Sequence, residues 1–226
     1  MKKSIIAVAM LLLSLTISAQ DYTHSIGGMV GSMYGVTYKG FIFGIDGLAL
    51  QADLGVNLFS LAGKGEMKTD GVKTDGVETD GVKTTSDIRN GAFFTFVANP
   101  NIVYQQNIAS WNFGSLSWFA GGGISLGLMQ QYGNMEIKDD NGDWTTFSVS
   151  DWKNFNNGKD QIYGKFGINA LAGLELGFSS VPLALGLDFR PGYGLGFRNQ
   201  KVNGVKTEQI VNFFDWSLAA SLRYCF

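Results

Sequence analysis

The chain has 226 residues, of which 16% are charged, 13% are aromatic and 31 are glycine. An average soluble domain has about 25% charged residues and about 7% glycine, so this chain is poor in charge and rich in glycine. The single cysteine excludes a disulfide framework and multi-cysteine metal sites. The single histidine argues against His-rich metal sites and most acid–base catalysis, and the net charge of −2 provides no basic surface for nucleic acid. These numbers fit a membrane barrel better than a soluble enzyme.

The N-terminus has the pattern of a secretory signal peptide. Residues 1–3 form a positive n-region, residues 5–17 form an apolar h-region, and small residues then lead to a predicted cleavage between Ala19 and Gln20. The apolar run is shorter than the ~20 residues that a transmembrane helix needs. We therefore expect residues 1–19 to be removed on export and residues 20–226 to form one domain.

The rest of the chain alternates between apolar and polar or small residues, with the period of two that a β-strand requires. The pattern is clearest near the C-terminus, where Phe214, Trp216 and Leu218 share one face. The opposite face carries Asp215 and Ser217. We expect eight strands, of which the first two have the weaker pattern: 23–32, 35–43, 48–58, 92–104, 116–128, 166–178, 183–198 and 214–226.

The two faces of these strands indicate what each face meets. The polar faces carry almost no large hydrophobic residues, so they could not form a dry core. The apolar faces carry aromatic residues near segment ends, such as Tyr104, Trp118 and Trp216, as an interfacial girdle requires. We therefore expect lipid outside and a polar interior, the reverse of a lipocalin-like soluble barrel.

Charges of both signs nearly balance on the inward faces. Buried charges must be paired, and a small barrel interior is a place where they can be. The residues expected to form this interior charge network are Lys39, Asp53, Lys165, Glu175, Asp188, Arg190, Asp215 and Arg223, and Arg198 shares the inward faces.

Strand number and loop lengths predict the orientation. Sixteen strands would leave too little chain for the visible loops, whereas eight strands give an interior that side chains just fill, which disfavours a wide porin. Long loops of such barrels are extracellular and short turns are periplasmic, so both termini are expected in the periplasm. The expected long loops are 60–91, 129–163 and 199–212; the shorter connections are 31–35, 44–47, 106–115 and 179–182.

The first long loop contains the one internal repeat. Three tandem pentapeptides occupy 68–72, 73–77 and 78–82, and Lys83-Thr84 starts a fourth. A period of five fits neither helix nor strand, and each copy carries a turn-forming Asp-Gly. Two interpretations stay open: a ligand-binding or antigenically variable tip, or a spacer.

Two further segments predict hairpins. Asn203-Gly204 is typical of a type I′ turn. Residues 136–138 and 144–147 are the expected arms of a second hairpin. The acidic stretch between them is not an EF-hand, because Ile137 and Ser148 would occupy two of the ligand positions.

Three segments carry a resemblance to a known family: Gly35-Val36-Thr37-Tyr38-Lys39, the glycine-rich 121–127, and the ending 222–226. From about residue 23 to 226 the chain resembles the small eight-stranded outer-membrane barrels of the OmpX/OmpA type, within the porin-like group. The resemblance implies an all-β, antiparallel transmembrane β-barrel in up-and-down meander order, in the outer membrane of a Gram-negative bacterium. In that family a final Phe is read by the barrel assembly machinery, so the assembly signal is expected at Leu222, Tyr224 and Phe226.

The resemblance implies several unlike functions. The leading hypothesis is a structural protein whose extracellular loops contact a protein or another surface ligand. A narrow channel or small-solute transporter is the alternative, because the inner faces of 116–128 and 183–198 are rich in glycine. A lipid-modifying enzyme would need a Ser/His/Asp-type set, whereas the only histidine, His24, is expected at the lipid interface. We therefore expect no enzyme, catalytic residue, cofactor or metal, a structural Cys225, and membrane lipid and the assembly machinery as partners, without nucleic acid.

Overall fold

The computed structural model describes most of the chain after its first 21 residues. The signal peptide expected at 1–19 and the acidic stretch 139–143 lie outside the described residues. Among the residues described, no helix is long and apolar enough to cross a membrane. The backbone is described for 22–42, 44–69, 73–74, 77–78, 82–131, 135–138, 144–147, 162–202 and 205–226, and side chains for 22–42, 44–57, 94–130, 162–199, 208 and 210–226.

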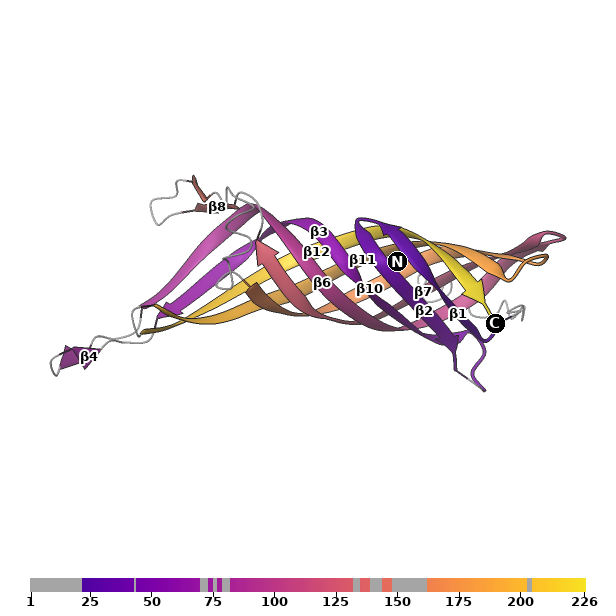
Figure 1. Ribbon diagram of the computed structural model, residues 1–226, viewed down its shortest axis with the longest axis horizontal. Coiled ribbons are helices and arrows are strands. Elements are labelled where there is room, and N and C mark those ends of the chain that lie inside the picture. Colours follow the sequence, from indigo (N-terminus) through magenta and orange to yellow (C-terminus); the bar gives the residue numbers. More distant parts are fainter. Residues whose placement is uncertain are drawn as a thin grey trace, which may run out of the picture.

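Eight antiparallel strands close into a ring in which chain neighbours are also spatial neighbours (Figure 1). The ring closes where the first strand pairs with the last, from Ser25↔Cys225 to Gly31↔Ala219. This arrangement confirms the expected eight-stranded meander barrel. The ring strands are β1 (His24–Gly31), β2 (Met33–Phe41), β3 (Leu48–Thr69), β6 (Val82–Trp111), β7 (Gly114–Gln131), β10 (Ile162–Phe178), β11 (Leu183–Val202) and β12 (Val205–Cys225).

Four short strands lie in the connections. β4 (Lys73–Thr74) pairs with β5 (Val77–Glu78) inside the repeat. β8 (Met135–Lys138) pairs with β9 (Trp144–Phe147), which confirms the second expected hairpin.

Several ring strands are longer than the sequence pattern predicts. β3 and β6 stay paired out to Thr69↔Val82, and β11 and β12 out to Val202↔Val205, so the expected loops 60–91 and 199–212 are largely strand. The connection expected at 106–115 is only residues 112–113, because β6 and β7 pair up to Trp111↔Gly114. The outer parts of these strands carry few large apolar residues, so the apolar alternation that indicates a strand is weak there.

The two strands of the first hairpin, β1 and β2, are much shorter than the other ring strands. The hairpin therefore ends partway along the barrel wall. Beyond its apex at Ser32, β12 pairs directly with β3, from Phe214↔Ala62 to Thr207↔Thr69. Ser32 closes this fork: its N–H donates to the Leu218 carbonyl at 3.0 Å, and its hydroxyl accepts from the Leu218 N–H at 2.8 Å. Six strands therefore remain above the fork.

Among the described residues, four of the ring strands continue beyond the outer ends of β7 and β10. Their ladder order is β6–β3–β12–β11, with β8 added to β6 at Ile88 and Arg89. β10 pairs with β11 no further than Phe197, so the last residues of β11 have only β12 beside them among the described ladders. We call these four strands beyond the barrel the projecting sheet.

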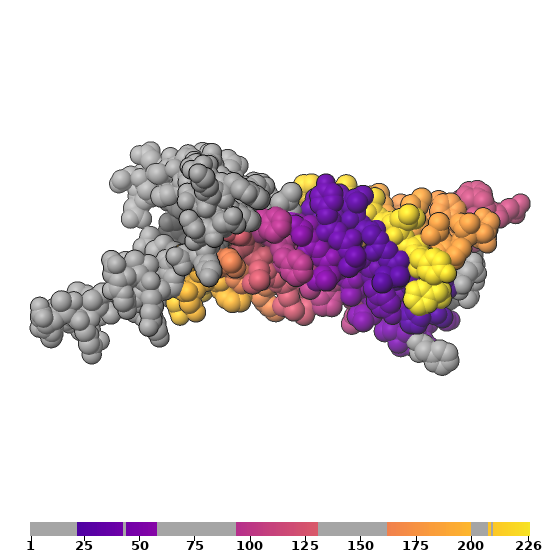
Figure 2. Space-filling view, in the orientation of Figure 1, coloured from indigo at the N-terminus to yellow at the C-terminus, as the bar shows by residue number. Residues whose placement is uncertain are grey.

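The barrel is apolar outside and mixed inside. Outward side chains such as Ile168 and Leu218 are exposed, and on the face shown in Figure 2 the side chains close the wall without a visible opening. Inward positions are buried, and they include Phe119, Leu171 and Phe213. The expectation that inward faces carry almost no large hydrophobic residue is therefore wrong: a lumen this narrow is filled by whatever side chains point into it.

Candidate functional site

Inward glycines make room in the lumen for the long side chains of neighbouring strands. A Cβ added at Gly186 would lie 2.4 Å from Nη2 of Arg223, and one added at Gly173 would lie 2.3 Å from the Phe119 ring. The glycine-rich inner face of β11 is thus occupied by side chains from β12. The channel hypothesis depended on free space beside these glycines of β11, and the side chains of β12 fill it.

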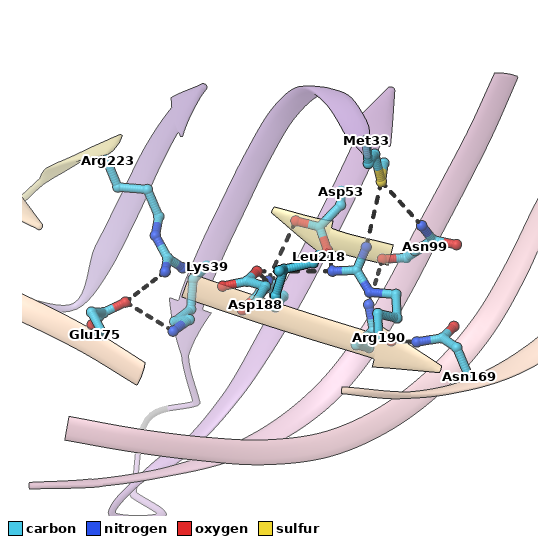
Figure 3. A network of polar contacts seen from close by, with 12 residues as sticks. Met33, Lys39, Asp53, Asn99, Asn169, Glu175, Asp188, Arg190, Leu218 and Arg223 are labelled. Atoms are coloured by element: carbon cyan, nitrogen blue, oxygen red, sulfur yellow. Dashed lines mark hydrogen bonds and ion pairs between the residues drawn. The ribbon is translucent and has the colours of Figure 1, made fainter. Parts of the chain in front are cut away.

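The first group of charges lies at the end of the barrel where both described termini meet, which we call the mouth. Glu175 is its centre: Oε2 lies 3.0 Å from Nζ of Lys39 and 2.9 Å from Nη2 of Arg223 (Figure 3). Its Oε1 accepts from Nε2 of Gln105 at 2.8 Å and from the Tyr22 hydroxyl. These five residues form the mouth cluster, in which one carboxylate meets two cations and two neutral donors.

Phe119 lies beside the mouth cluster, and Tyr22 closes it toward the N-terminus. Nζ of Lys39 lies 4.0 Å from the centre of the Phe119 ring, a cation–π contact that shields the ammonium from below. Tyr22 precedes the first strand, and burial together with the Glu175 carboxylate raises the pKa of its phenol. The phenol therefore stays protonated and donates to Glu175.

The second group, the middle cluster, lies deeper in the lumen. Nη2 of Arg190 lies 2.5 Å from Oδ2 of Asp53 and 3.9 Å from Oδ2 of Asp188. Nε2 of Gln51 donates to Asp188 at 3.0 Å, and Nη1 of Arg190 lies 3.5 Å from the Met33 sulfur. One arginine therefore contacts carboxylates from two strands (Figure 3).

The third group lies toward the projecting sheet. Lys165 on β10 forms an ion pair with Asp215 on β12, and its Nζ lies 5.3 Å from the centre of the Phe213 ring. Beside this pair, the amide of Asn169 donates to Oδ1 of Asn101 at 2.5 Å. Charge and amide pairs thus cross the lumen at three levels.

The eight residues expected in the charge network all lie at inward positions. Seven are buried, and the side chain of Asp215 is 14% exposed. They fall into three groups rather than one. Arg198 lies outside these groups, with its guanidinium 5.4 Å from the centre of the Tyr163 ring.

Sequence reasoning missed the neutral partners in these groups. Gln51 and Gln105 stand at the inward positions of their strands, so the period of two could have identified them. Tyr22 precedes the first strand and carries no such signal.

The mouth holds a cavity of about 330 Å³ above the mouth cluster. Tyr22, Gln105 and Glu175 line it toward the lumen, while Cys225 and the turn between β10 and β11 line its rim. All carboxylate oxygens of Glu175 already have donors, and in the described part of the chain no group of three His, Cys, Asp or Glu residues could hold a metal ion. The cavity therefore ends on a carboxylate whose oxygens are already bonded and which has two cations beside it.

The outer rim of the mouth is aromatic. Nδ1 of His24 lies 2.9 Å from the Tyr38 hydroxyl, and its ring lies 5.7 Å from that of Phe226. Leu222, Tyr224 and Phe226 are all more than half exposed on the outward face, where the assembly signal is expected. Their recognition by the assembly machinery stays a prediction.

No family model and no curated protein matches the chain. Two solved proteins resemble it in structure. Neisserial surface protein A (NspA) is 13% identical, with a TM-score of 0.32 over 90% of this chain and 93% of that one. Ail, the attachment invasion locus protein of Yersinia pestis, crystallised with the heparin analogue sucrose octasulfate, is 13% identical, with a TM-score of 0.25 over 89% of this chain and 96% of that one. The fold assignment rests on the strand pairings of this chain itself: it is an eight-stranded, antiparallel meander β-barrel.

Proposed function

We propose that the protein is an integral outer-membrane protein whose barrel is a closed anchor for a β-sheet held outside the cell. The observation that carries the proposal is the continuation of β3, β6, β11 and β12 beyond the barrel as an open sheet. In this reading both termini lie in the periplasm and the projecting sheet meets an extracellular protein.

The outer surface of the barrel supports insertion into a bilayer. Along β12 the outward side chains are apolar or small from Tyr224 to Phe214, and most of the large ones are about half exposed. Ten residues at about 3.3 Å each, tilted by about 40°, rise about 25 Å, which is the height of the apolar band of an outer-membrane barrel. A surface this apolar is unfavourable in water, whereas a closed barrel in lipid leaves no backbone group unpaired.

The length of the strands supports a part outside the membrane. β1 has 8 residues and rises about 20 Å at that tilt, which is nearly one bilayer core. β6 has 30 residues and reaches about 70 Å or more along the same axis. Most of the excess lies on the side away from the termini, where the projecting sheet begins.

The filled lumen supports an anchor over a channel. The mouth and middle clusters and the Lys165–Asp215 pair obstruct the lumen in sequence, and each joins opposite charges from different strands. Opening a water path would separate these buried pairs, which is costly in a low-dielectric interior.

The projecting sheet offers a strand edge to which a partner protein could bind. Its outer strand β11 carries backbone N–H and C=O groups with no neighbour beyond Phe197 among the described ladders. An extended segment of another protein could add to such an edge, with backbone hydrogen bonds supplying affinity.

Two measurements test the proposal. Trypsin added to intact cells should cut within the repeat, which carries Lys68, Lys73 and Lys83, and leave a barrel fragment that still migrates anomalously on an unboiled gel. Protection of the repeat in intact cells, with cleavage after lysis, would reverse the orientation. Purified protein in planar bilayers should give no reproducible conductance steps, and regular single-channel steps would replace the anchor by a narrow channel.

A further inference from the structure

A small second cavity lies between the middle cluster and the Lys165–Asp215 pair. Its volume is about 20 Å³, and it is lined by side chains from seven of the ring strands, among them Asn57, Asn169, Arg190, Val97 and Ser217. A cavity needs about 10–15 Å³ to hold one water molecule, so this space accommodates one such molecule and nothing larger.

Three residues that line this cavity, from three strands, each have one polar atom without a partner. Oδ1 of Asn57, Oδ1 of Asn169 and Nε of Arg190 make no hydrogen bond to any described atom of the protein. The three residues are each at least nine-tenths buried, at 5%, 9% and 6% exposure. A buried donor or acceptor without a partner is destabilising, and native interiors satisfy such groups with protein atoms or ordered water.

The hydrogen bonds around the cavity determine which polar atoms of Asn169 and Arg190 are left without a partner. Nδ2 of Asn101 donates to the Asn99 carbonyl at 2.8 Å, so Oδ1 of Asn101 must be the acceptor for the Asn169 amide. That bond uses Nδ2 of Asn169 and leaves its Oδ1. Arg190 is held in the same way: Nη2 contacts Asp53 and Nη1 contacts Met33, which leaves Nε–H (Figure 3).

A ligand for these atoms must accept one hydrogen bond and donate two. A monovalent cation cannot accept from Nε–H, and chloride cannot donate to two amide oxygens, so neither ion satisfies the set. A water molecule matches it, because water carries two donors and two acceptor sites.

We propose that this cavity is a binding site for one structural water molecule. The water accepts from Nε–H of Arg190 and donates to Oδ1 of Asn57 and Oδ1 of Asn169. It connects the middle cluster to the amide pair beside Lys165 by hydrogen bonds. The site does not depend on the proposed function, since a conducting barrel could also hold this molecule.

The test is magnetisation transfer from water to the Arg190 Nε–H proton in the ¹⁵N-labelled full chain, folded in detergent micelles. We expect a cross-peak with the sign of a long-lived bound water. Val97→Leu adds one methylene into the cavity and should abolish the cross-peak. Val103→Leu is the matched control, because Val103 is equally buried on the same strand but does not line the cavity, and it should keep the peak.

The wild-type spectrum decides the proposal by itself. Folded wild-type protein without the cross-peak would overturn it, as would a Val97→Leu protein that keeps the peak at full intensity. A shift of the Arg190 Nε resonance on titration with sodium or potassium chloride, without a water cross-peak, would identify an ion instead. If Val97→Leu gives no heat-modifiable band, Ser217→Val replaces it, with Ser221→Val on the same strand as its control.

Discussion

The same four strands pass through two different surroundings, the barrel and the projecting sheet. In the barrel every strand has a neighbour on both sides, the outward face is apolar and the inward charges are paired. In the projecting sheet β11 and β12 still pair residue by residue, but beyond Phe197 β11 has no second neighbour among the described strands, and the apolar alternation has ended. A strand in lipid must satisfy every backbone group within the protein, whereas a strand in water need not. We therefore infer that the boundary between the barrel and the projecting sheet lies where the strands leave the bilayer and enter water.

The largest effect is expected in the lumen, from Glu175→Gln. The substitution leaves Lys39 and Arg223 buried without their counter-charge and turns an amide N–H toward them. We expect the free energy of unfolding to fall by about 3–5 kcal/mol, measured by urea unfolding of the protein in lipid vesicles. Glu208→Gln on the exposed part of β12 is the matched control, with a change within about 0.5 kcal/mol. Equal stability of the two variants would mean that the mouth cluster does not hold the barrel together.

The next effect concerns the apolar outer face and depends on depth. Leu218 lies near the middle of the outward band on β12, whereas Ile26 lies beside Tyr224 at the mouth. In vesicles, Leu218→Arg should cost about 2–4 kcal/mol of unfolding free energy and Ile26→Arg about 0–1 kcal/mol. Urea titrations of both variants and the wild type provide the comparison. Two equal costs would contradict the position that we assign to the bilayer.

The sequence predicted the part of the fold that faces lipid. The alternation of Phe214, Trp216 and Leu218 places the last strand in the wall, and the inward set from Lys39 to Arg223 is where the pattern puts it. The period of two is visible there because two unlike solvents lie on the two sides of the strand.

The rest could not be predicted, for two physical reasons. The outer parts of β3 and β6 carry few large apolar residues, so their continuation leaves a weak periodic signal and they were expected as loop. The division of the charges into three groups depends on the stagger between strands, which sets Glu175 rather than Asp188 against Lys39. One sequence without its register does not contain that information.

A third, smaller effect is expected at the fork between the two regions. The hydroxyl of Ser32 stands in for a strand partner, since it bonds both the N–H and the C=O of Leu218. Ser32→Ala leaves that N–H without this acceptor and should lower the free energy of unfolding by about 1–2 kcal/mol. Ser32→Thr keeps the hydroxyl and should lose less than half of that. If Ser32→Ala unfolds at the wild-type urea concentration, the fork is closed by its backbone alone.

The smallest effect on stability is expected at the tip of the projecting sheet. Replacing residues 70–81 by Asn-Gly would join the paired ends Thr69 and Val82 through the same two residues that the sequence has between the paired residues Val202 and Val205. The barrel ladders are untouched, so the unfolding free energy should change by no more than about 0.5 kcal/mol. Heat modifiability should persist, because it reports the barrel.

This variant also separates the two interpretations of the repeat. If neither the length nor the sequence of the tip matters, cells carrying the replacement should keep any binding of an extracellular protein that wild-type cells show, because the edge of β11 is unchanged. If binding is lost while folding is kept, the tip acts either through its length or through its sequence. A Gly-Ser segment of the same length in place of 70–81 is the control, since it restores the length without the sequence. Binding that is recovered in this variant indicates a spacer. Binding that is not recovered assigns the contact to the Thr-Asp-Gly-Val sequence. Loss of heat modifiability in either variant would contradict the separation of barrel and projecting sheet, because it would show that the tip is needed to close the ring.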